Sequence, residues 1–226
     1  MSTTNSPPKN TTNNANRKQE ETPPYYQIRA NHTPTTITIY QAYPPFIACP
    51  AITTQSFTKI PQFSRSRMTW IKPSFLWMAY RSGYASKTGQ ERVLAIEITR
   101  EGFEWALRHA CLSHTPKDAS EEEVRAWSEK MRKSPVRVQW DPERDLWGRP
   151  LGWRSLQVGL KGEAVERYIE QWIVGIRDVA KLMHDVKERV DRGDVEEASA
   201  LLPIEDAYGL PEDIGRGIGM YGLYSI

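Results

Sequence analysis

The sequence predicts an α+β fold, with a single mixed, largely antiparallel sheet and flanking helices. Alternating apolar stretches typical of strands occur along most of the chain, and amphipathic stretches with helix-capping residues lie between them. Two of the predicted strands also follow one another directly, which does not fit a regular βαβ series. We expect a disordered leader over residues 1–23, one domain over residues 24–205 and a Gly-rich C-terminal tail over residues 206–226.

In the first half of the chain, residues 35–42 (TTITIYQA) predict a half-buried strand, and a shorter strand is expected at residues 26–30. The strand over residues 35–42 ends before Pro44 and Pro45, and the Pro-rich stretch that follows predicts a loop. A helix is expected from Pro73 to Gly83, because proline is favoured in the first turn and glycine at the end.

The second half predicts a strand over residues 92–99 and a helix over residues 101–110. Ser120 and Glu123 form a capping box, which predicts the start of an outer, polar helix that reaches Lys133. Residues 136–140 and 154–160 predict a long-looped hairpin. Helices are then expected over residues 162–172, 178–192 and 195–202.

Acidic residues are distributed very unevenly. From Thr22 to Gln90 the chain has 69 consecutive residues without one Asp or Glu, although its 226 residues include 28 acids. This stretch carries seven basic residues, whereas the remainder after it has 26 acids against 20 Lys and Arg. A positive potential without internal carboxylates suits an anionic partner, such as a nucleotide, a nucleic-acid backbone or an anionic metabolite.

Several classes of protein are disfavoured by composition. No stretch has the roughly 18 apolar residues of a membrane span, and residues 1–22 contain no apolar run of a signal peptide. The two cysteines form no disulfide framework. We therefore expect a soluble protein that is not secreted and does not bind a membrane, in the cytoplasm or the nucleus.

The densest candidate site is the segment from Arg65 to Arg92, which interleaves basic and aromatic side chains. Arg and Lys make charge-assisted hydrogen bonds to phosphate, and aromatic faces stack on bases. The alternative is that these aromatics mainly form the core. We expect a positively charged cleft that binds a nucleotide or RNA through Arg29, Tyr40, Gln41, Arg67, Lys72, Trp77, Arg81 and Lys87.

The same segment carries a family resemblance. The blocks RMTWIKPSFLWMAYRSG and QERVLAIEITREGFEWAL, with IRA and TITIYQAY before them and VRVQWDPERD and LLPIEDAYGLP after them, resemble a bacterial and fungal domain of unknown function. The resemblance covers roughly Gln27 to Pro211 and implies one compact domain, without implying an activity. Members of that family commonly have an Asp after the IRA block, where this chain has Asn31 and His32, so an acidic role there is absent.

Glu91 is the candidate catalytic residue, because it is the first acid after the acid-free stretch and directly precedes a predicted strand. The order Arg29, Ser56 with Thr58, and Glu91 is similar to that of ADP-ribosyltransferases, a similarity that implies NAD as cofactor. Arg29 would then bind the NAD phosphates and Glu91 would stabilise an oxocarbenium-like state. The alternative is that Glu91 only pairs with a neighbouring base at the end of a strand.

Two other motifs give little evidence for a function. Residues 217–222 match GxGxxG, yet no strand precedes them, so we expect a flexible tail and no dinucleotide fold. His109, Cys111 and His114 do not share a helical face and lack a fourth ligand, so we expect no metal. The sequence therefore favours an enzyme, a nucleotide- or NAD-using transferase. It leaves open a non-catalytic RNA or protein interaction module and an accessory enzyme of a small-molecule pathway, such as fungal secondary metabolism.

Overall fold

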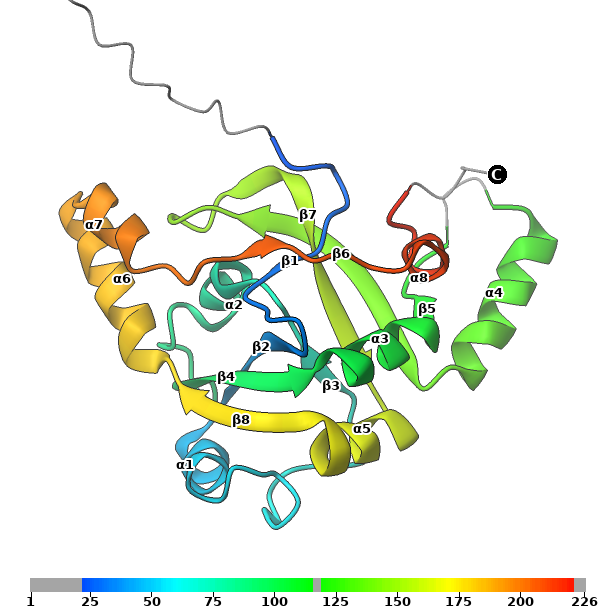
Figure 1. Ribbon diagram of the computed structural model, residues 1–226, viewed down its shortest axis with the longest axis horizontal. Helices are drawn as coiled ribbons and strands as arrows, with labels where there is room; N and C mark the ends of the chain where they lie inside the picture. Colours follow the sequence, from blue (N-terminus) through cyan, green and yellow to red (C-terminus); the bar gives the residue numbers. More distant parts are fainter. Residues whose placement is uncertain (1–21, 116–118, 222–226) are drawn as a thin grey trace, which may run out of the picture.

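The computed structural model describes residues 22–115 and 119–221, which form an α+β fold (Figure 1). The strands are β1 (Arg29–Ala30), β2 (Thr36–Tyr43), β3 (Thr69–Ile71), β4 (Arg92–Thr99), β5 (Ala110–Leu112), β6 (Val136–Arg144), β7 (Pro150–Leu160), β8 (Ile173–Asp178) and β9 (Asp206–Ala207). The helices are α1 (Pro45–Thr54), α2 (Phe75–Ser82), α3 (Arg100–Arg108), α4 (Glu121–Lys133), α5 (Glu163–Arg167) with the π-helical turn η1 (Tyr168–Trp172), α6 (Ala180–Arg192), α7 (Val195–Ala200) and α8 (Glu212–Gly217).

The strands are divided among separate sheets, and do not form the single sheet that we expected. One antiparallel sheet has the order β2-β4-β8, and a second has the order β3-β7-β6-β5, in which only β5 and β6 are parallel. Strands β1 and β9 form a third, two-stranded sheet. An isolated bridge between Tyr40 and Lys72 connects β2 to the chain just after β3, so the two larger sheets meet there.

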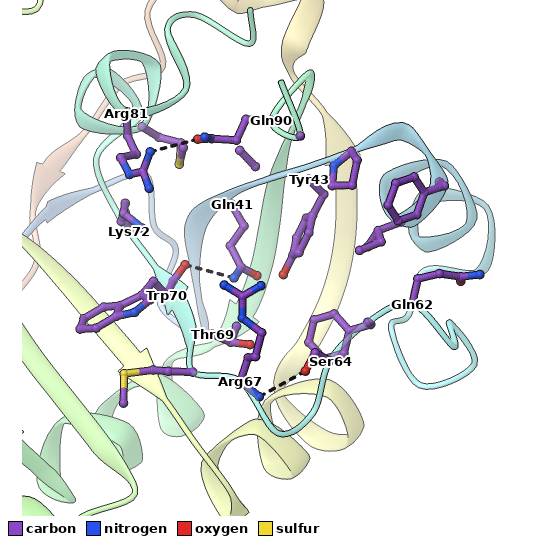
Figure 2. Close-up of a pocket in the computed structure, with 18 residues that line it drawn as sticks. Gln41, Tyr43, Gln62, Ser64, Arg67, Thr69, Trp70, Lys72, Arg81 and Gln90 are labelled. Atoms are coloured by element: carbon purple, nitrogen blue, oxygen red, sulfur yellow. Dashed lines mark hydrogen bonds between the residues drawn. The ribbon is translucent and has the colours of Figure 1, made fainter. Parts of the chain in front are cut away.

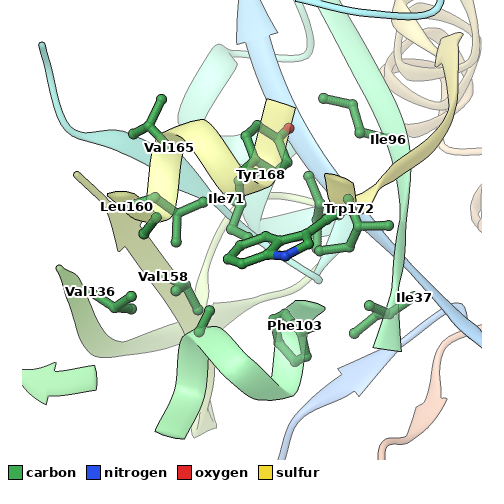
Figure 3. Packing of buried hydrophobic residues seen from close by; sticks show 14 of the residues in the cluster. Ile37, Ile71, Ile96, Phe103, Val136, Val158, Leu160, Val165, Tyr168 and Trp172 are labelled. Carbon is green, nitrogen blue, oxygen red and sulfur yellow. The ribbon is translucent and has the colours of Figure 1, made fainter. Parts of the chain in front are cut away.

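Strand β4 separates two hydrophobic clusters. Leu94, Ile96 and Ile98 point into the larger cluster, which also contains side chains of β2, β6, β7 and α3 (Figure 3). Val93 and Ala95 point the other way, into a cluster formed with α2 and α6. Because successive side chains of a strand face opposite sides, a strand buried on both faces is apolar almost throughout.

Local sequence accounts for the ends of the predicted helices. Ser74 precedes α2 and its Oγ accepts a hydrogen bond from the Trp77 amide, while Gly83 ends the helix with a φ of 60°. Ser120 and Glu123 form the expected capping box of α4, and none of the described side chains of that helix is buried. The prediction of an outer helix is therefore confirmed.

Several elements differ from the sequence prediction, and in α1 and β8 packing outweighs local preference. Pro50 lies inside α1, where proline normally breaks a helix, yet Ile47, Ala48 and Ala51 are buried by that helix. Strand β8 follows η1 and pairs with the second edge of β4, where we expected no strand. Pairing partners of this kind are distant in sequence and leave no local signal.

The predicted C-terminal tail is also corrected by the structure. Tyr208, Ile214 and Ile218 belong to the larger hydrophobic cluster, and the Trp140 indole donates a hydrogen bond of 2.8 Å to the Ile218 carbonyl. Apolar burial therefore holds the glycine-containing segment against the rest of the chain. The predicted leader falls almost wholly on residues 1–21, which lie outside the described residues. Over the part of the chain that the structure does describe, no helix is both long and apolar enough to cross a membrane.

Candidate functional site

A pocket of about 550 Å³ lies where β2, α1, β3 and α2 converge (Figure 2). The loop before β3 and the loop before β4 complete its walls. Its apolar part is formed by Ala42, Pro44, Phe46, Ile47, Phe63, Met68, Trp70 and Met78. Its uncharged polar part is formed by Gln41, Tyr43, Gln62, Ser64, Thr69 and Gln90, with Gly89 beside them. A pocket of this volume can enclose a ligand of nucleotide size.

The charged side chains of this pocket are all basic. Arg67, Lys72 and Arg81 line it, and no Asp or Glu does. Among the described residues, none of these three side chains has a carboxylate partner within ion-pair distance. Most of the other described arginines do form ion pairs with carboxylates. Arg65, two residues from Arg67, pairs with Glu166 and Glu170 outside the pocket. The pocket is therefore a site of positive potential that the protein itself does not neutralise.

Lys72 is the buried member of the three, with only 6% of its surface exposed. Its Nζ lies 5.0 Å from the centre of the Trp77 ring, and no hydrogen bond from it is observed within the described residues. Burial, and secondarily the nearby Arg81 charge, lower the pKa of Lys72 from 10.5 to about 7, although Asp141 acts in the opposite direction. At neutral pH a large share of Lys72 is thus an uncharged amine.

Gln41 forms the polar floor beside these cations. Its Nε2 donates to the Trp70 carbonyl at 3.1 Å, and its Oε1 accepts from the Tyr168 hydroxyl at 2.7 Å. Both ends of the amide are therefore held, which fixes its orientation. The Tyr168 phenol is wholly buried, and burial raises its pKa well above the usual range, so this tyrosine stays a donor.

The loop from Gly83 to Gln90 positions one rim of the pocket. Tyr84 and Ala85 both have positive φ values, 56° and 64°, which side chains with a Cβ rarely adopt. The Tyr84 hydroxyl donates to the Leu146 carbonyl and anchors the loop. At its end, Gln90 Oε1 accepts a 3.4 Å hydrogen bond from Arg81, as Figure 2 shows. The loop that contains the two strained residues thus ends at a side chain that contacts Arg81.

Two half-buried glutamates lie at the start of α2. Glu205 Oε1 accepts from the Phe75 amide at 2.7 Å, and Glu143 Oε1 accepts from the Ser74 hydroxyl at 3.0 Å. Burial raises the pKa of both carboxyl groups, and the charge of Glu143 raises that of Glu205 further. These groups fix the beginning of α2, the helix that carries Arg81, but neither lines the pocket.

The structure brings together four of the predicted ligand-binding residues: Gln41, Arg67, Lys72 and Arg81 all line the pocket. Trp77 lies behind them and contacts Lys72 instead. Tyr40 packs against Phe75 in the interior. Lys87 donates from Nζ to the Arg81 carbonyl, and so it supports the loop. Arg29 donates to the Glu205 carbonyl at 2.7 Å, away from this pocket.

Glu91, the predicted catalytic residue, does not line the pocket either. Its Oε1 accepts from the Gly89 amide at 2.8 Å, and its Oε2 is buried with no hydrogen-bond partner in the described part of the chain. Ser56 and Thr58 lie in the turn after α1, where their hydroxyls contact each other at 2.9 Å, and not on a strand. The three positions that suggested an ADP-ribosyltransferase arrangement therefore do not meet in this pocket.

The sequence prediction did not identify one aromatic wall of the pocket, which is formed by Tyr43, Phe46, Phe63 and Trp70. Phe46 is 62% exposed, which is unusual for such a large apolar side chain. Phe46 lies on α1, a segment that the sequence predicted to be a loop, so the sequence did not indicate that this side chain lines a pocket. The aromatic residues around Arg67 were the available signal, since basic and aromatic residues alternate there.

One comparison with known proteins supports the coarser part of the resemblance described from the sequence, namely that the chain belongs to a family of domains of unknown function. A search of curated proteins finds no match. A family model described as "Domain of unknown function (DUF4291)" matches residues 27–208, and this range contains every residue of the pocket. The chain therefore belongs to the DUF4291 family of domains of unknown function.

Proposed function

We propose that the pocket binds a nucleotide-type anion. The observation that supports this most is a set of three basic side chains, Arg67, Lys72 and Arg81, none of which pairs with a carboxylate among the described residues. The guanidinium groups suit phosphate oxygens, because their planar donors can bind two oxygens at once. A flat organic group would lie against the aromatic wall at Phe46 and Trp70.

A small ligand fits this geometry better than a nucleic-acid strand. The unpaired cations face a concave pocket of about 550 Å³ and are not spread along an open groove. Strand-binding proteins track a backbone over several nucleotides with successive aromatic platforms. The proposed ligand is therefore a mononucleotide or a phosphorylated sugar. The NAD-based arrangement of Arg29, Ser56 and Glu91 is not part of this proposal.

The test is calorimetric titration with AMP, inorganic phosphate, adenosine and a short RNA oligomer. We expect AMP to bind and adenosine to bind at least tenfold more weakly, because the phosphate makes the charge-assisted contacts. Arg81→Gln should weaken AMP binding about tenfold or more, as expected for a lost hydrogen bond to a charged group worth about 1.5–3 kcal/mol.

The matched control is Arg65→Gln, which removes an arginine of the same segment that pairs with Glu166 outside the pocket. It should leave AMP affinity unchanged. Equal loss in both variants would mean that only the general surface charge matters. Tight binding of the RNA oligomer without binding of AMP would replace this proposal with a nucleic-acid interface.

A further inference from the structure

The Lys72 amine has an environment that a structural role does not explain. It is buried in the pocket wall, and its backbone is fixed because the Tyr40 amide donates to the Lys72 carbonyl at 2.7 Å. Within the described residues its Nζ makes neither a hydrogen bond nor an ion pair, and it faces the Trp77 ring. Desolvating an amine costs free energy, so a fold that only needed packing would place an apolar side chain in this pocket wall.

The charged groups around Lys72 favour its neutral form. Arg81 on α2 and Arg67 before β3 line the same pocket, and the Arg81 charge opposes protonation of the amine. The Asp141 carboxylate on β6 favours protonation of Lys72, but it accepts hydrogen bonds from Gln139 at 2.8 Å and Gln157 at 2.6 Å. A desolvated lysine beside another cation is the usual form of an activated amine nucleophile.

We propose that Lys72 is a nucleophile that forms an imine with an aldehyde or ketone carbon of a phosphate-bearing ligand. The inference rests on the proposed function, because Arg67 and Arg81 hold the phosphate while the amine reacts. The uncharged Nζ attacks the carbonyl carbon, and a carbon–nitrogen bond forms. The carbonyl oxygen takes up the two amine protons and leaves as water, which balances the step without an oxidant or a reductant.

This inference narrows the ligand class. Of the two ligands proposed above, a phosphorylated sugar that opens to its free aldehyde or ketone carries both the phosphate and the electrophilic carbon, whereas a mononucleotide lacks that carbon because its anomeric carbon is bonded to the base. Fixing the phosphate beside the amine converts a bimolecular reaction into a local one, which raises the effective concentration of the carbonyl. Lys72 would then be a catalytic residue, and Arg67 and Arg81 would be the binding residues.

The test uses pyridoxal 5′-phosphate as a phosphorylated aldehyde and pyridoxal as its matched form without phosphate. The full-length protein is incubated with each, the imine is trapped with borohydride, and the modified lysines are located by peptide mass spectrometry. We expect Lys72 to be labelled at least tenfold faster by pyridoxal 5′-phosphate than by pyridoxal. It should also react at least tenfold faster than the exposed Lys59, and AMP should protect it.

Two variants make the result specific. Lys72→Met keeps a side chain of similar length and should abolish the protected adduct, whereas Lys59→Met should leave it unchanged. Mapping of the wild-type protein gives the same information if Lys72→Met does not fold. The rate of Lys72 labelling should rise with pH through neutrality, as the amine loses its proton.

The outcomes separate this inference from the proposed function. If AMP binds but pyridoxal 5′-phosphate labels exposed lysines as fast as Lys72, the nucleophile is refuted and the anion site stands. If pyridoxal labels Lys72 as fast as the phosphorylated probe and AMP does not bind, the phosphate-binding role fails, and the inference built on it fails too.

Discussion

At the scale of single residues, the pocket depends on side chains whose charge is set by their surroundings. Arg67 and Arg81 are exposed, whereas Lys72 is buried and its pKa is lowered to about 7. Three basic residues of one acid-free stretch therefore lie in two different environments. The uneven distribution of acids predicted the positive potential, but the lowered pKa of Lys72 follows first from its burial and then from the Arg81 charge, which the sequence does not show.

Lys72 should make the stability of the protein depend on pH. Its pKa is about 7 in the folded state and 10.5 ordinarily, so between these values the unfolded chain binds more protons than the folded one. The free energy of unfolding should therefore increase with pH from about 7, by up to about 1.4 kcal/mol per pH unit. Below pH 7 both the folded and the unfolded chain bind the Lys72 proton, so Lys72 no longer makes the stability depend on pH. Urea unfolding at pH 7, 8 and 9 measures it.

Lys72→Met provides the comparison, because methionine does not titrate and suits a buried position. The variant should lose the rise between pH 7 and 9 and should be more stable than the wild type at pH 7. Lys59→Met, at an exposed position, should keep the wild-type slope. Equal slopes in the wild type and in Lys72→Met would show that the amine is not desolvated in the folded protein.

At the scale of elements, close packing between α3 and η1 fixes how the helices cover the sheet of β2, β4 and β8. Gly102 on α3 lies against Trp172, and a Cβ atom at that position would come within 2.3 Å of the Trp172 ring. Trp172 is buried in the larger cluster and lies 5.6 Å from the Trp105 ring and 6.4 Å from the Tyr168 ring, measured between centroids. The ring has little room to move.

Gly102→Ala should therefore destabilise the protein, although alanine favours helix formation elsewhere. We expect a loss of about 1–3 kcal/mol from overpacking, measured by urea unfolding. The matched control is Gly152→Ala on β7, where nothing lies within 4 Å of the added Cβ, and its effect should be at most about 0.5 kcal/mol. Equal stability of Gly102→Ala and wild type would show that Trp172 can repack.

At the scale of the whole molecule, the C-terminal segment completes the fold around β1. The Tyr208 amide donates to the Ile28 carbonyl at 2.8 Å, and the Arg100 guanidinium lies 4.3 Å from the Tyr208 ring. Ile214 and Ile218 are almost fully buried. Strand β9 lies beside β1 in Figure 1, so the two ends of the described chain support each other.

A chain truncated after Glu205 should be unfolded or severely destabilised. It loses three buried side chains, Tyr208, Ile214 and Ile218, each worth about 1.5–3 kcal/mol, and the sum approaches the total stability of a typical domain. Circular dichroism and thermal unfolding measure this. A chain truncated after Tyr221 retains all of these contacts and should unfold like the wild type. A folded 205-residue protein would mean that residues 206–221 form a dispensable tail.

The sequence by itself determined the α+β class, the ends of α2 and α4, the strand β4 and the concentration of positive charge. These features depend on capping residues, alternation and composition, which are local properties of the chain. Tertiary structure alone decided that Arg67, Lys72 and Arg81 meet in one pocket while Arg29 and Lys87 do not. It also decided the helix at Pro50, strand β8 and the burial of Ile214. In each case the stabilising contacts join residues far apart in sequence, and burial against them outweighs the local preference.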